Sequence, residues 1–185
     1  LMGLLMLVAL TYVPYNLASE APAMDRIRLE SSIEALVGAK LVFFTALMLV
    51  PIVVFQGAIV GVDALSTVDY SAVSAVAPGA VLALLLTFVT LAALSMAVMV
   101  ATGFGTTGRF VNVLLLLGVV GFSGLAYPVG YFSPLRRELT RAMPTHYATI
   151  ITRSGMLRGS TVEAYATWLA GLALVAVLAL VVLKL

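Results

Sequence analysis

The sequence lacks cysteine entirely and contains few charged residues. Without cysteine, it can form neither disulfide bonds nor thiolate metal sites. Its one histidine, His146, has no carboxylate close by in sequence, so we predict no metal site. Charged residues make up only 10% of the chain, whereas soluble domains carry about 25%. The net charge of +2 comes without a basic cluster, which argues against nucleic-acid binding.

Long apolar runs dominate the 185 residues, of which 63% are hydrophobic. Each run approaches or exceeds the ~20 helical residues needed to cross a bilayer, and none shows the alternation of membrane β-strands. We therefore predict an all-α integral membrane protein, a polytopic helical bundle that forms a single transmembrane domain over residues 1–185. The predicted spans are 1–18, 39–62, 75–102, 110–127 and 162–183.

Prolines and the first residue refine this prediction. Pro14 and Pro51 fall inside predicted spans, and we expect each to kink its helix because proline lacks a backbone N–H. The chain begins at Leu1 in the middle of an apolar run, so we expect that part of the protein precedes it.

The first long polar stretch predicts a short amphipathic helix over residues 20–35, called the coupling segment below. Ser31 and Glu34 have the spacing of a capping box that opens the second span. Two interpretations remain open for this segment. It either lies on the lipid surface or docks a cytosolic partner.

Residues 128–160 predict two short helices between the last two spans. Pro128 ends the fourth span, Ser133 and Pro134 begin a helix that Pro144 ends, and a second helix follows over 147–157. Such broken helices are typical of a re-entrant or interfacial hairpin. In the first of them, an apolar stripe lies opposite an arginine face. The stripe comprises Leu135, Leu139, Ala142 and Met143, and the arginine face comprises Arg136, Arg137 and Arg141.

Charge counting leaves the orientation undecided, because Lys and Arg divide five and five between the two sides.

Two glycine motifs can be explained either by a function or by ordinary helix structure. The run GFGTTG at 103–108 fits a dinucleotide loop, but apolar spans flank it, so a tight interhelical turn is the better interpretation. The run GFSG at 121–124 fits rhomboid intramembrane proteases, in which Ser123 would need a base such as His146. Close helix packing explains these glycines equally well.

Polar residues within the spans are few. Asn16, Gln56 and Asn112 are candidates for a substrate pathway, and hydrogen bonding between helices is an equally good explanation for them. Charged residues are absent from the middle of the predicted spans, which argues against ion-coupled secondary transport.

Three stretches together resemble the type-2 ABC transporter permeases, an ABC exporter-like family. They are Glu20, Arg28, Ser31 and Glu34 with EALVGAK, then FSGLAYP, then MPTHYATIITRSGMLRG. Ser31–Ser32 stands where the family has Gly-Thr. The order of these stretches and the lone final span also agree, and the resemblance places the family's first span before Leu1.

The resemblance implies a permease subunit in the cell membrane, performing no chemistry of its own and binding no cofactor. Two permease chains would pair, and a separate ATPase subunit holding ATP and Mg would power alternating access, in the direction of export. The coupling segment would be cytoplasmic, with docking residues Glu20, Asp25, Arg26, Arg28, Glu30 and Glu34. Short extracellular helices would re-enter the membrane in a segment marked by Gly124, Pro128, Arg136, Arg137, Pro144 and Arg153.

Two alternatives to this family remain. They are a rhomboid-like intramembrane serine protease and a secondary transporter or structural membrane subunit.

Overall fold

Apolar runs become long helices in the computed structural model, which describes residues 1–20, 22, 32–65, 78–125, 129–158 and 162–184. No β-strand occurs among these residues, which confirms the predicted all-α class. Within these described ranges, four helical segments are long and apolar enough to cross a membrane. They are Met2–Ser19, Ala35–Phe55, Pro78–Ala101 and Val162–Leu183.

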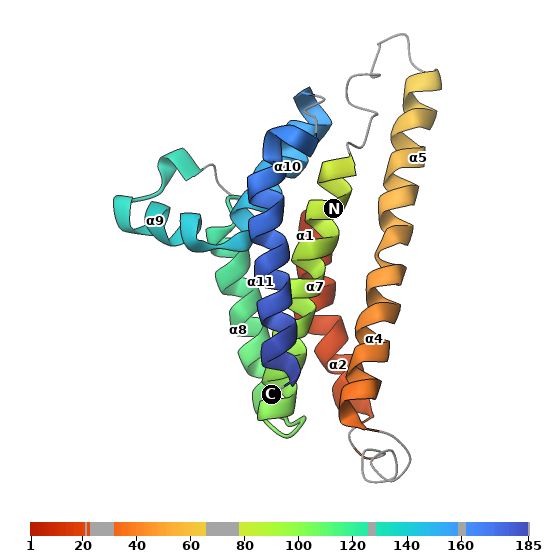
Figure 1. Cartoon of the computed structure of the whole chain (residues 1–185), viewed down its shortest axis with the longest axis vertical. Helices are drawn as coiled ribbons and strands as arrows, with labels where there is room; N and C mark the ends of the chain where they lie inside the picture. The colour runs from red at the N-terminus through yellow and green to blue at the C-terminus, as the bar shows by residue number, and fades with distance from the viewer. Residues whose placement is uncertain (21, 23–31, 66–77, 126–128, 159–161, 185) are drawn as a thin grey trace.

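The long helices lie side by side and run roughly along the long axis of the molecule (Figure 1). The first span is built from α1 (Met2–Leu7), the π-helical turn η1 (Val8–Tyr12) and α2 (Val13–Ser19), and the second from α4 (Ile33–Leu47) and α5 (Leu49–Leu65). Next come α7 (Pro78–Ala101), α8 (Thr106–Phe122), η3 (Val129–Tyr131), α9 (Pro134–Ala142), α10 (Pro144–Arg158), η4 (Val162–Tyr165) and α11 (Ala166–Lys184).

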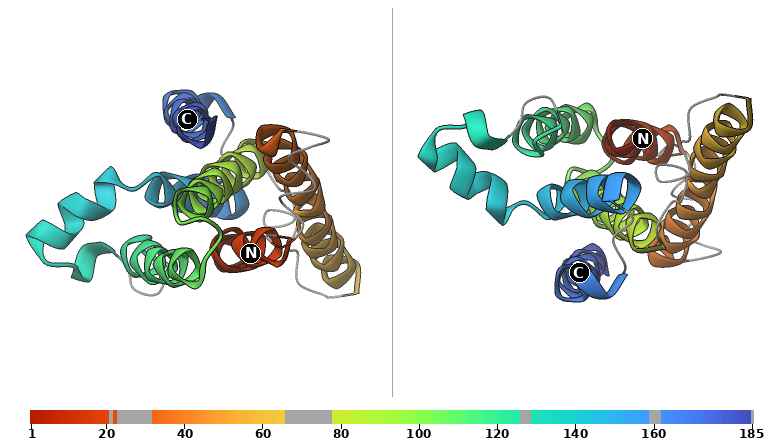
Figure 2. Two further views of the ribbon diagram at one scale, coloured as in Figure 1. Left: turned by 90° about the horizontal axis from the view of Figure 1, so that it is seen from below. Right: turned by 90° about the horizontal axis from the view of Figure 1, so that it is seen from above.

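Helix α7 lies at the centre of the bundle. It packs against α11, α10, α4 and the first span, as both views along the bundle show (Figure 2). Leu84, Phe88 and Met96 of α7 are fully buried, and so are Met6 and Leu10 of the first span. Helix α5, in contrast, leans away from the other helices and exposes Val53 and Val54 (Figure 1).

Two ends of the bundle can be distinguished in Figure 1. At the lower end α2 finishes, α4 begins, and α7 turns into α8, while the chain itself ends there after α11. At the upper end α5 finishes, α7 begins and α10 meets η4.

Both span prolines follow an interruption of the regular helix. The π-helical turn η1 ends two residues before Pro14, and α4 gives way to α5 at Met48, three residues before Pro51. A proline removes the hydrogen bond to the carbonyl four residues back and crowds that carbonyl. Those carbonyls belong to Leu10, inside η1, and Leu47, the last residue of α4. The helix is therefore interrupted at the carbonyls that each proline leaves without a hydrogen bond.

The predicted span over 110–127 is wrong in its bounds. Helix α8 covers Thr106–Phe122 and has 17 residues, which is about 25 Å of rise against ~30 Å of hydrocarbon. It begins early because Gly103–Gly105 makes a tight turn directly after α7. It ends early because Gly124 adopts φ +74°, a left-handed conformation that closes a helix.

The turn before α8 explains the GFGTTG motif. Phe104 N–H donates to the Met99 carbonyl at 2.8 Å, and Gly103 N–H donates to the Val100 carbonyl at 3.2 Å. This pair of bonds is the Schellman arrangement, with Gly103 at φ +63°. The interhelical turn predicted for the motif is confirmed.

The predicted capping box is also wrong, by one residue. Ser32 caps α4, because its side chain accepts the Ala35 N–H at 3.1 Å. Glu34 is then the second helical residue, whereas a capping box needs its acid at the third. Of the coupling segment, Glu20 is the C-cap residue of α2 and residues from Ile33 on belong to α4. Its residues 21 and 23–31 lie outside the described residues.

Two helices stand between α8 and the last span, as predicted. Ser133 caps α9 and Pro134 occupies its first turn. The second helix begins at Pro144, earlier than the predicted 147, because proline is well suited to a first turn. Helix α9 projects sideways from the bundle, and α10 returns to pack along α7 (Figures 1 and 2).

Candidate functional site

A charged cluster joins the first two spans at the lower end of the bundle. Lys40 of α4 donates from Nζ to Oε1 of Glu20 at 2.7 Å and to Oδ1 of Asn16 on α2. The Lys40 side chain is only 12% exposed, whereas that of Glu20 is 38% exposed. An ammonium group with so little access to water needs such partners, because burying it unpaired costs several kcal/mol.

The cluster forms the polar end of a groove of about 520 Å³ between α2 and α4. The other end of the groove is aromatic and is lined by Tyr12, Phe43 and Phe44. Tyr12 and Phe44 meet edge to face, with ring centroids 5.8 Å apart. The first and second spans are therefore joined by a charged contact and an aromatic contact side by side.

A third element holds the end of α2. The guanidinium of Arg109, in the first turn of α8, lies over the ring of Tyr15, 5.3 Å from its centroid. The end of α2 is thus held by α4 through Lys40 and by α8 through Arg109. A displacement of α2 at this end would act on both neighbouring helices.

The predicted docking residues are only partly placed. Glu20 belongs to the charged cluster, and Glu34 lies in the first turn of α4, with its side chain outside the described set. The remaining docking residues lie outside the described residues. They are Asp25, Arg26, Arg28 and Glu30. Sequence reasoning missed Lys40 as a site residue, although it is one of only two lysines and sits at the start of an apolar run.

The three predicted pathway residues have separate surroundings. Asn16 accepts from Lys40, and the side chain of Gln56 in α5 lies outside the described set. Asn112 of α8 is fully buried, and its Nδ2 donates to the Ser95 carbonyl of α7 at 3.2 Å. For Asn16 and Asn112, contacts between helices are what the structure shows.

Ser95 extends this contact to the first span. Its hydroxyl donates to the Ala9 carbonyl in η1 at 2.7 Å and also contacts the Ala92 carbonyl at 3.0 Å. Val13 N–H donates to the Val8 carbonyl in the π pattern, and the next donor in that pattern would be Pro14, which has no N–H. The Ser95 hydroxyl therefore donates to the Ala9 carbonyl, which lacks the backbone N–H that a residue other than proline at position 14 would provide.

At the upper end, an arginine of α9 turns toward the protein. Arg136 donates from Nη2 to the Gly121 carbonyl at 2.7 Å, and its guanidinium lies 3.9 Å from the centroid of Phe132. Gly121 is in the last turn of α8, where a cation is favoured by the helix dipole. Arg153 approaches the Gly124 carbonyl at 3.4 Å, and Pro144 opens α10.

The two faces expected on α9 need a correction. Arg136 and Arg137 are half-buried, and Arg137 donates to the carbonyls of Gly130 and Phe132, so these side chains bind backbone. Thr140 is the buried residue of α9, so the face of α9 that contains Thr140 is covered by protein. Leu135 and Leu139 of the apolar stripe point away from the protein, with Leu135 74% exposed. Pro128 lies outside the described residues.

Ser123 makes hydrogen bonds to backbone groups near the end of α8. Its hydroxyl donates to the Val120 carbonyl at 3.0 Å and accepts the Leu125 N–H at 3.3 Å, so its bonds are those of a helix end. His146 lies in the first turn of α10 and contacts Tyr147. Partial burial lowers the pKa of His146, and the nearby charge of Arg141 lowers it further.

Comparison with known proteins gave no match to any family model, curated protein or solved structure.

Proposed function

We propose that the chain is the permease subunit of an ATP-driven ABC transporter, working in the direction of export. The observation that carries the proposal is the Lys40–Glu20–Asn16 cluster. It joins α2 and α4, the helices that flank the coupling segment, which the resemblance described above makes the docking site of a separate ATPase. A force applied to that segment would reach α2 and α4 together.

The residues inside the bundle favour an energy source for transport that lies outside this chain. Lys40 and Glu163 are the only charged residues in the four candidate spans, and both are near span ends. Of the buried polar groups, Ser95 and Asn112 take part in hydrogen bonds between helices. These described residues offer little from which to build a proton or ion relay. A two-state bundle biased by a partner's nucleotide state fits them better.

The proposal also assigns the two ends. The lower end faces the cytoplasm of the cell and meets the ATPase, and the upper end faces outward. Helices α9 and α10 are then the short outer helices of the family, re-entering the outer leaflet between α8 and the last span. A second permease chain completes the pathway for the substrate.

A pull-down from native membranes tests the proposal. The tagged chain is expected to recover an ATPase with a Walker A motif, and the pair should hydrolyse ATP in proteoliposomes. Arg28→Glu, a charge reversal in the coupling segment, should abolish recovery of that ATPase. Arg141→Glu, an equal reversal at the exposed upper end, should leave it unchanged. Recovery of no ATPase, or equal recovery with both variants, would overturn the proposal.

The protease alternative is disfavoured by the bonds of Ser123. Its proton is given to the Val120 carbonyl and not to a base. Failure of a serine-reactive fluorophosphonate probe to label Ser123 would end that alternative. Transport that depends on an ion gradient and needs no ATP would favour the secondary transporter.

A further inference from the structure

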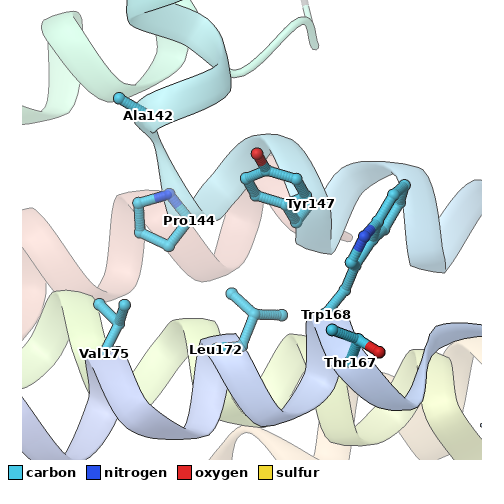
Figure 3. Close-up of a pocket in the computed structure, with 8 residues that line it drawn as sticks. Ala142, Pro144, Tyr147, Thr167, Trp168, Leu172 and Val175 are labelled. Atoms are coloured by element: carbon cyan, nitrogen blue, oxygen red, sulfur yellow. The ribbon is translucent and has the colours of Figure 1, made fainter.

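A pocket of about 290 Å³ lies between the start of α10 and one face of α11 (Figure 3). Its main walls are Pro144, Tyr147, Trp168, Gly171, Leu172 and Val175. The volume is at the lower end of the roughly 300–1,000 Å³ of small-molecule pockets. It therefore suits one narrow apolar chain better than a bulky ligand.

Gly171 contributes no side chain to the wall of the pocket, which leaves room beside it. No neighbouring heavy atom lies within 4 Å of the position that a Cβ of residue 171 would take. Leu172 beside it is buried, and Val175 one turn further is partly exposed. A larger residue at position 171 would thus enter open space without displacing packed atoms.

Aromatic rings mark one end of the pocket. Trp168 and Tyr147 meet edge to face with centroids 5.3 Å apart, and Tyr165 lies 5.7 Å from Trp168. Such rings concentrate where the headgroups of a bilayer meet its hydrocarbon. Tyr165 is three residues into the span that starts at Val162, near this boundary, and Trp168 lies one helical turn deeper, about 9 Å of helix rise from Val162.

The other end of the pocket lies deeper in the span. Val175 is seven residues beyond Trp168, or about 10 Å further along α11. The same helix exposes Leu174, Val177 and Leu178, which a bilayer would surround with acyl chains. The pocket therefore begins a short way below the headgroups, runs deeper into the hydrocarbon and is apolar at its deep end.

We propose that this pocket binds one acyl chain of a bilayer phospholipid. The first carbons of the acyl chain lie level with Tyr147 and Trp168, below the glycerol, and the chain follows α11 past Gly171 to Val175. This inference requires only that α11 spans a membrane, and it is independent of the proposed ATP-driven transport.

Trp168 makes the test direct, because it is the only tryptophan in the chain. The purified full chain in detergent micelles is titrated with phosphatidylcholine brominated in the acyl chain near the glycerol end, and quenching of Trp168 fluorescence is recorded. Quenching should saturate at a low mole fraction of lipid, as binding to a site does. Gly171→Leu should weaken the apparent affinity about tenfold, the factor expected when roughly two methylene groups lose their burial.

Ala170→Leu is the matched control, because Ala170 is exposed on α11 outside the pocket. Trp168 fluorescence of this variant should be quenched with the same apparent affinity as that of the unsubstituted chain. Both substitutions should leave the helix intact, because leucine has a high helix propensity. If quenching of Trp168 in the unsubstituted chain rose in simple proportion to the mole fraction of brominated lipid, Trp168 would contact bulk lipid only, and the proposal would be overturned. Equal affinities of the Gly171→Leu and Ala170→Leu variants would overturn it as well.

Discussion

At the residue scale, Lys40 shows how a single charge can be kept at the edge of an apolar span. The residue lies within the candidate span Ala35–Phe55, yet its ammonium group reaches a carboxylate and an amide oxygen from α2. Lys side chains near span ends can extend toward water, but here most of the side chain is covered by protein. The side chain therefore acts as a contact between helices.

Lys40→Met tests this contact. Removing the ammonium leaves Glu20 and Asn16 without their partner, so we expect the free energy of unfolding in detergent to fall by about 1–3 kcal/mol. Glu20→Gln is the control, because an amide oxygen can still accept from Nζ and the loss should be smaller. Thermal unfolding of the purified variants gives the comparison. If Lys40→Met were as stable as the native chain, the cluster would not hold the two spans together.

His146 offers a second test at this scale, as the sole histidine and hence a single NMR signal. Its pKa should lie below the usual 6.5, chiefly because burial disfavours the imidazolium. Arg141→Gln should raise this pKa without restoring the usual value, since burial remains. Between the lowered pKa and 6.5 the unfolded chain binds more protons, so stability should rise with pH there. A pKa above 6.5 would contradict this environment.

At the scale of the element, the first span is organised around Pro14. The missing N–H leaves backbone acceptors in η1 without their usual donors, and the hydroxyl of Ser95 on α7 reaches the Ala9 carbonyl. Asn112 on α8 in turn donates to the Ser95 carbonyl. An interruption in one helix thereby becomes a contact among three helices.

A double-mutant cycle measures this relation. In the native chain Ser95→Ala should cost about 0.5–1.5 kcal/mol, the range of hydrogen bonds between membrane helices. In a Pro14→Ala background the helix regains an N–H, Val13 can return to the Ala9 carbonyl, and Ser95→Ala should cost less. Equilibrium unfolding of the four proteins in mixed micelles gives the coupling energy. The same cost in both backgrounds would refute the compensation.

The limits of prediction from sequence are clearest at the ends of elements. Apolar runs identified the helices, because a bilayer leaves the backbone no other partners, and the proline positions identified where two helices are interrupted. The choice of Ser32 over Ser31 as the cap could not be read from the sequence, because both residues have the same capping chemistry. The short length of α8 likewise depends on Gly124 closing the helix.

Across the whole molecule, the contacts that matter most for the candidate site join residues far apart in sequence. The Lys40–Asn16 bond and the Ser95–Ala9 bond span 24 and 86 positions. Helical periodicity predicts which face of a helix is apolar, but not which polar side chain will meet which carbonyl on another helix. For that reason Asn16 and Asn112 could be singled out, while their partners could not.

The whole molecule also has two distinct ends, and the proposed function depends on which side of the membrane each one faces. Because the sequence has no cysteine, single cysteines can be introduced without background labelling. Pro22 is exposed in the coupling segment, and the charged Arg141 is exposed on α9.

A membrane-impermeant maleimide applied to intact cells is the most direct test of this assignment. We expect it to label Arg141→Cys at once and Pro22→Cys only after the membrane is permeabilised. Labelling of Pro22→Cys in intact cells, with Arg141→Cys protected, would place the coupling segment outside the cell, where no ATP-driven partner could act on it.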